Sequence, residues 1–258
     1  MMDPQSSQPN PGTPRELNLQ RSAEQFMIGM QRHFDMLAFN LAARQTVTEE
    51  SYQAKVQEPA MLLVPQFHQN FEQMQAHSRD LLFTQAINDN LQLAVACLNQ
   101  VHLFLALIKA QKENGGLPPK IQHEVQQKQG DFLRLPLEQK FNLLEEKYGV
   151  MSELEDGITS LGMAFQALSR QGGVVKEDQL DEQKELVIEF KKAPDFSSEM
   201  ELGAKLREMV TVTKTFREGE KISFTDLELQ LMLLTTAVFA HQLFSAVATY
   251  ARRLQEEG

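Results

Sequence analysis

The chain has 258 residues, and 42% of them are hydrophobic, so it can build a packed core and is not globally disordered. The formal net charge of −10, from 35 acidic and 25 basic side chains, excludes a general attraction to nucleic-acid phosphates; such binding would need a local basic patch. The single cysteine, Cys97, excludes an internal disulfide. It lies in an apolar run and is predicted to be a buried residue of a protein in the reducing cytoplasm.

The N-terminal segment MMDPQSSQPNPGTP has four prolines among its fourteen residues and no basic region followed by an apolar one. We therefore expect a disordered tail over residues 1–14 and no signal peptide. Residues 15–258 are expected to form one helical domain, with a β insert at about residues 184–224. Its first helix is predicted to begin at the capping sequence Thr13–Glu16 and to end near Gln45.

The next elements are predicted from caps and breakers. Thr48 caps a short helix that ends before Pro59, and Pro65 opens an amphipathic helix. The polar run Asn88–Asn90 is expected to kink or break that helix. An apolar helix, Leu91–Gln111, then follows.

Glycine pairs and prolines mark the middle of the chain. Asn114–Gly116 ends the apolar helix, and the prolines after it open a polar helix that is expected to end near Gly130. A helix over Leu137–Tyr148 is closed by Gly149. Ser152 and Glu155 predict a capping box for the next helix, Leu154–Arg170.

The periodicity then changes from that of helices to that of strands. Two β-branched segments, Glu185–Phe190 and Glu208–Phe216, are predicted strands, and Lys221–Phe224 is a candidate third. Thr225, with Glu228 in the capping-box position, is expected to open a final helix that runs to about Arg253. The predicted fold is mainly α: a bundle of about seven helices with a small antiparallel hairpin inserted before the long C-terminal helix.

Two uncharged apolar segments, Asn90–Ile108 and Leu229–Ala251, raise the question of a membrane, and the second is long enough to span one. Glutamine, asparagine and histidine residues interrupt both segments and would be costly against lipid. We therefore expect both to be central helices of a bundle, with no membrane contact. A membrane-anchored alternative depends on Leu229–Ala251 and predicts loss of the protein from the soluble fraction.

The six histidines offer few candidate sites. None forms a pair with the spacing of metal ligands, and no phosphate-binding or nucleophile motif occurs, so no metal or cofactor is predicted. His102 and His241 lie within the apolar helices and are predicted to be hydrogen-bonded core or pocket-lining groups. An enzyme with a dispersed site around these two histidines remains an alternative.

Three segments carry a resemblance to a known family. They are Leu135–Val150 (LPLEQKFNLLEEKYGV), Leu161–Leu180 (LGMAFQALSRQGGVVKEDQL) and Lys214–Leu234 (KTFREGEKISFTDLELQLMLL). Together they resemble a prokaryotic HEPN-type helical domain over about half of the chain. The resemblance implies an RNA-cleaving motif of Arg-Asn followed by His on the helix before Gly172.

At the corresponding positions this chain has Phe165 and Gln166 for Arg-Asn, and Arg170 for the histidine. A phenylalanine can neither transfer a proton nor neutralise a phosphate, and an arginine that stays protonated is a poor general base. The resemblance therefore implies a catalytically degenerate member of the family. Phe165 is expected to be a core residue.

The preferred function is a non-catalytic HEPN-like module that acts through protein contacts, with a homodimer as one form of contact. The first alternative is a nucleic-acid or nucleotide binder that uses Arg170, Lys176 and Arg134 for phosphate contacts, although the net charge disfavours it.

Overall fold

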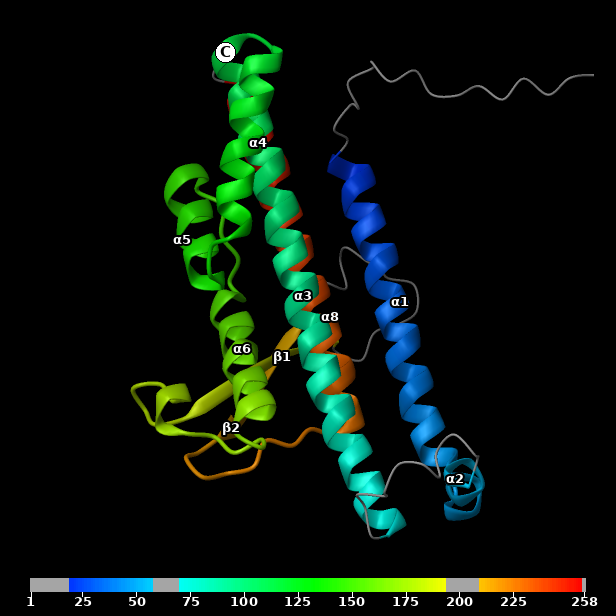
Figure 1. The fold of residues 1–258 in the computed structure, drawn as a ribbon. Helices are drawn as coiled ribbons and strands as arrows, with labels where there is room; N and C mark the ends of the chain where they lie inside the picture. Colours follow the sequence, from blue (N-terminus) through cyan, green and yellow to red (C-terminus); the bar gives the residue numbers. More distant parts are fainter. Residues whose placement is uncertain (1–18, 58–69, 194–208, 257–258) are drawn as a thin grey trace, which may run out of the picture.

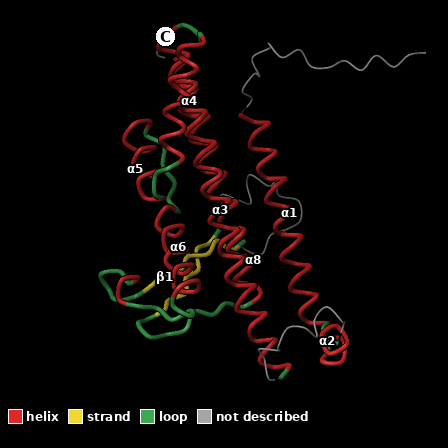
Figure 2. The backbone as a smooth tube through the Cα atoms, in the orientation of Figure 1, coloured by secondary structure: helices red, strands yellow, loops and turns green. Residues whose placement is uncertain are grey.

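The computed structural model describes residues 19–57, 70–193 and 209–256, and these have the predicted mainly helical fold (Figure 1). They contain seven α-helices, of which two form a long central pair, and a two-stranded antiparallel sheet precedes the last helix (Figure 2). The elements are α1 (Leu19–Thr46), α2 (Glu49–Val56), α3 (Phe71–Asn114), α4 (Pro119–Leu133), α5 (Leu137–Tyr148), α6 (Glu155–Arg170), η1 (Glu177–Gln179), β1 (Leu186–Lys192), β2 (Val210–Phe216) and α8 (Asp226–Glu256). The predicted tail over 1–14 and the helix starts at Thr13 and Pro65 lie outside the described residues.

The helices that contain the two predicted apolar segments, α3 and α8, are central, as predicted. They run parallel, because successive contacts join residues at a nearly constant separation: Arg79 with Phe224, Asn90 with Thr236, and Lys112 with Leu254, which are 145, 146 and 142 residues apart. α1 runs in the opposite direction beside them (Figure 1). The C-terminal ends of α3 and α8 therefore lie together, and their facing side chains form the core.

By length and composition, α3 and α8 are also the two helices in the described chain that could cross a membrane. In α8, 61% of the most apolar stretch is buried inside the fold, and in α3 the share is 44%. The burial in α8 fits the predicted role of a central bundle helix. Cys97 on α3 is fully buried, as expected, and burial raises the pKa of its thiol.

The predicted break at Asn88–Asn90 is wrong, because α3 continues without interruption from Phe71 to Asn114. The Asn90 side chain donates to the carbonyl of Ala86, 2.8 Å away, and accepts from the Thr236 hydroxyl at 2.7 Å. Asp89 accepts from Gln85 on the same helix. Because these polar groups are satisfied along the helix and by α8, they do not compete with its backbone.

The predicted end of α4 near Gly130 is also wrong, since the helix continues to Leu133. Phe132, beyond the glycine, is buried against α3, and its burial favours the extra turn. The following helix agrees with the prediction over Leu137–Tyr148. It ends at Gly149, which has a φ of 63°, a conformation that glycine adopts without strain.

The start of α6 and the β insert differ from expectation in detail. Glu155 accepts from the backbone of Ser152, but the Ser152 hydroxyl accepts from Leu154, so only half of the predicted capping box forms. β1 pairs with β2 from Leu186↔Phe216 to Lys192↔Val210. Alternate residues of β1 are buried, and the strand packs against α6 and α8.

The candidate third strand at Lys221–Phe224 does not form in the described chain. Lys221 makes a single bridge to Val174, and the backbone of Ile222 donates to Gly173, so this segment pairs with the loop after α6 instead of β2. The predicted Thr225–Glu228 capping box is confirmed by reciprocal hydrogen bonds of 2.7 and 3.2 Å, and α8 begins immediately after Thr225.

Candidate functional site

The positions that the HEPN resemblance singles out lie on the second half of α6. Phe165 is partly buried and packs against the core, while Gln166 is partly exposed. Arg170 is the last residue of the helix and is exposed. Phe165 therefore has a packing role, as expected from its place on the apolar stripe of α6.

The predicted phosphate contacts come from three separate segments. Arg134 is the exposed C-terminal cap of α4, Arg170 ends α6, and Lys176 precedes η1. Lys176 lines a shallow hollow with three acidic residues, Glu177, Asp178 and Glu218. Acidic neighbours repel an anion, so the surroundings of Lys176 are unsuited to phosphate.

His102 is buried, as predicted, and it belongs to a polar cluster that the sequence did not indicate. Its ring stacks on Phe132 with centroids 4.0 Å apart, and its Nδ1 is 2.6 Å from Oε1 of Gln129. Because Gln129 also donates to the carbonyl of Asn99 at 2.9 Å, its Oε1 is the acceptor and Nδ1 of His102 carries the proton. Burial, with Lys147 and Lys140 nearby, lowers the pKa of His102, so the ring is neutral.

Lys140 completes this cluster from α5. Its ammonium group donates to Oδ1 of Asn99 at 2.9 Å and to the carbonyl of Phe132, and it lies 4.3 Å from the centroid of the Phe132 ring. Burial lowers the pKa of this lysine. The hydrogen bonds of this buried cluster join α3, α4 and α5, which indicates a structural role.

The second predicted histidine, His241, lies on a different helix from His102. His241 lies partly buried on α8, whereas His102 lies in the α3–α4–α5 layer. Across the described ranges 19–57, 70–193 and 209–256, no group of three or more His, Cys, Asp or Glu side chains could hold a metal ion.

Three large apolar side chains are exposed on α1. Ile28, Met36 and Phe39 are 55, 58 and 68% exposed, although Phe and Ile are usually among the most buried residues. The opposite face of α1 packs on the core through Met30, Leu37 and Leu41. A surface helix normally has one apolar stripe, so the second stripe on α1 needs an explanation.

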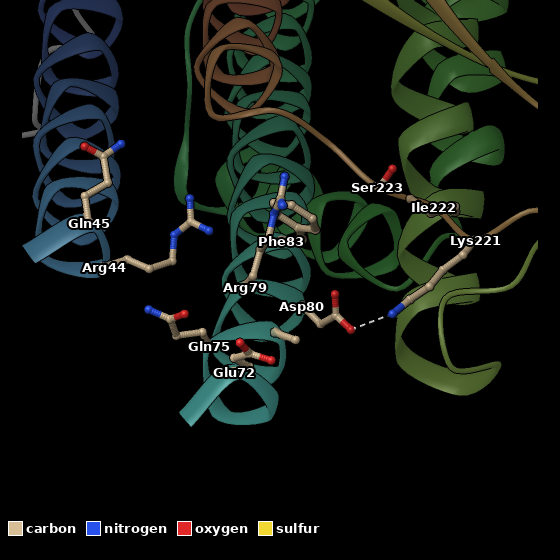
Figure 3. A pocket seen from close by; sticks show the side chains of 11 residues that line it. Arg44, Gln45, Glu72, Gln75, Arg79, Asp80, Phe83, Lys221, Ile222 and Ser223 are labelled. Atoms are coloured by element: carbon tan, nitrogen blue, oxygen red, sulfur yellow. Dashed lines mark hydrogen bonds and ion pairs between the residues drawn. The ribbon is translucent and has the colours of Figure 1, made fainter. Parts of the chain in front are cut away.

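A cavity lies between the C-terminal end of α1, the first turns of α3 and the segment before α8 (Figure 3). Its volume is about 750 Å³, and it is lined by three cationic side chains, Arg44, Arg79 and Lys221. They come from segments far apart in the chain, so the sequence alone did not bring them together.

Comparisons of this chain with protein-family models, curated proteins and solved structures find no match.

Proposed function

We propose that this chain is a non-catalytic helical module that acts through protein contacts, and that the outer face of α1 binds a second copy of the chain. The observation that carries the proposal is the exposed stripe of Ile28 and Phe39, which lies opposite the face that packs on the core, with the exposed Met36 on its flank toward α3. Exposed apolar stripes of this kind mark protein interfaces.

The sequence of the stripe supports a second copy as the partner. Ile28, Arg32, Asp35 and Phe39 follow one another at intervals of four, three and four residues, the spacing of a coiled-coil seam. If two α1 helices pair antiparallel with the symmetry axis level with the His33–Phe34 bond, Ile28 lies beside Phe39 of the second copy. Arg32 then lies beside Asp35 of the second copy, and symmetry repeats both contacts.

The charges of this arrangement are complementary. Arg32 and Asp35 are both exposed and form no ion pair with another described residue of their own chain, so each is available for the second copy. The two central layers of the pairing contain opposite charges, and the flanking layers contain apolar side chains. A parallel pairing would place Arg32 against Arg32, so the charges favour the antiparallel one.

The test is the mass of the protein in solution as a function of concentration, measured by sedimentation equilibrium. We expect a reversible dimer that is weakened about tenfold or more by Arg32→Glu or by Asp35→Arg, since each single change places like charges side by side. The double variant Arg32→Glu/Asp35→Arg exchanges the two charges and should restore the dimer.

Arg170→Glu on α6 is the matched control, because it reverses an exposed arginine away from α1 and should leave the association unchanged. A wild-type chain that stays monomeric at every concentration would overturn self-association and would leave the exposed stripe for a different protein. Failure of the double variant to recover would overturn the antiparallel register.

The non-catalytic part of the proposal is supported by the α6 side chains. Phe165 packs against the core where an RNA-cleaving HEPN motif would need an arginine, and the helix contains no histidine. Membership of the HEPN family stays a prediction. Cleavage of single-stranded RNA by the wild-type chain, abolished by Arg170→Ala, would contradict the proposal that the chain is non-catalytic.

A further inference from the structure

The cavity of about 750 Å³ at the end of α1 has an uneven charge balance (Figure 3). Nζ of Lys221 is 2.7 Å from a carboxylate oxygen of Asp80. Nη2 of Arg44 is likewise 2.7 Å from Asp226. These two cations are neutralised by the protein itself.

Arg79 is not neutralised in this way. Its guanidinium donates to the backbone carbonyl of Phe224 at 3.1 Å and lies 5.2 Å from the centroid of the Phe83 ring, but it has no carboxylate partner among the described residues. Glu72, the second acidic residue of the lining, lies toward the start of α3, away from the Arg79 guanidinium in Figure 3. The positive charge of Arg79 therefore faces the cavity without a counter-charge.

Arg44 contributes a second unmet group. Its Nε–H is buried and has no hydrogen-bond partner among the residues that the structure describes, although its Nη2 is bound to Asp226. A buried donor without a partner costs about 1–3 kcal/mol relative to a satisfied one. Both arginines line the cavity: Figure 3 shows the Arg44 guanidinium in the space between α1 and α3, and the Arg79 guanidinium beside Phe83 on α3.

We propose that this cavity binds a small ligand through an oxyanion, either a carboxylate or a phosphoryl group, held by Nε of Arg44 and the guanidinium of Arg79. Planar guanidinium groups match the oxygen geometry of both anions. One negative charge would balance Arg79, and one oxygen would satisfy the Nε–H of Arg44. A nucleic-acid strand is disfavoured, because the chain as a whole carries a net charge of −10.

This site is independent of the proposed dimer. Arg44 lies on the side of α1 that turns toward α3 and α8, whereas the proposed dimer face is the outer one. A failure of either proposal therefore leaves the other untouched.

The experiment follows the arginine Nε–H resonances of the full chain by nitrogen-15 NMR while inorganic phosphate is added at constant ionic strength. Citrate is titrated in a parallel series. We expect a saturable shift of the Arg44 Nε–H signal with at least one probe. Saturation with phosphate alone assigns a phosphoryl ligand, and saturation with citrate alone assigns a carboxylate.

Arg79→Gln should weaken the affinity about tenfold or more, because it removes a charge-assisted hydrogen bond. Arg79→Lys keeps the charge and should retain part of the binding, which separates loss of the site from loss of the fold. Arg170→Gln, an exposed arginine on α6, is the matched control and should bind like the wild type. The proposal is overturned if neither probe saturates the Arg44 signal, or if Arg79→Gln binds both probes as the wild type does.

Discussion

His102 stays neutral in the folded chain because burial opposes its charged form, and the positive charges of Lys147 and Lys140 add to that effect. Its pKa is therefore below the value of about 6.5 that an unfolded chain would have. As the pH falls through this range, the unfolded chain takes up a proton that the folded chain does not. The stability that His102 contributes is thus complete above about pH 6.5 and is lost below it.

We expect the free energy of unfolding of the wild type to fall on acidification, relative to His102→Gln, by at most about 1.4 kcal/mol per pH unit. Urea unfolding between about pH 5 and pH 8 measures this difference. His123→Gln is the control, because His123 is exposed on α4 and should give a curve parallel to that of the wild type. Parallel curves for the wild type and His102→Gln would mean that the ring is not buried as described.

The sequence predicted the burial of single side chains in the candidate site, but not their partners. The burial of His102 follows from its place in an apolar segment, so the sequence indicated it. Its partners were missed, because Gln129 is 27 residues away and Lys140 reaches Asn99 across 41 residues. Similarly, Ile28 and Phe39 were visible in the sequence, but only the packing of α1 shows that they stay exposed.

At the scale of elements, local signals predicted the helix ends well where the cap is built from neighbouring residues. Thr225 and Glu228 bond each other three residues apart, and Gly149 ends α5 through its own backbone conformation. The predictions failed where distant contacts decide. Asn90 does not break α3, because Thr236 on α8 satisfies its side chain, and Gly130 does not end α4, because Phe132 packs on α3.

The contact between Asn90 and Thr236 is the buried polar link between the two central helices. Thr236→Val keeps the shape of the side chain but leaves Oδ1 of Asn90 without a donor in the core, which should lower the free energy of unfolding by about 1–3 kcal/mol. The double variant Asn90→Leu/Thr236→Val should cost less than the sum of the two single changes, since it removes both polar groups. Denaturant unfolding of the four proteins gives the coupling energy.

Thr235→Val is the matched control for this cycle. Thr235 is equally buried on α8, but its hydroxyl bonds the backbone of Lys191 on β1 and not α3. Its effect should therefore add to that of Asn90→Leu without coupling. Strict additivity for Thr236→Val as well would show that the hydrogen bond between α3 and α8 does not contribute to stability.

At the scale of the whole molecule, α3 and α8 connect elements from both ends of the chain. α3 packs against α1, α4, α5 and α6, and α8 packs against α1, α3 and β1. The short helix α2 also meets α3, because the ring of Tyr52 lies beside that of Phe71 with centroids 5.8 Å apart, and β1 contacts α6 as well as α8. The sequence prediction of one helical domain over residues 15–258, with the strands as an insert, implies that these parts unfold together.

We therefore expect a single cooperative unfolding transition, with the helical signal at far-ultraviolet wavelengths and the tyrosine signal at near-ultraviolet wavelengths coinciding. Phe239→Ala tests the coupling, because Phe239 is fully buried on α8 and its ring meets Phe141 of α5 edge to face, with centroids 6.1 Å apart. Its removal should cost about 3–5 kcal/mol and shift both signals to lower denaturant by the same amount.

Leu227→Ala, an exposed leucine on the same helix, is the control and should shift neither signal. If the far-ultraviolet transition moved while the tyrosine transition stayed in place, the surroundings of Tyr148 and Tyr250 would unfold separately from the rest of the helices, and the single-domain prediction would be wrong.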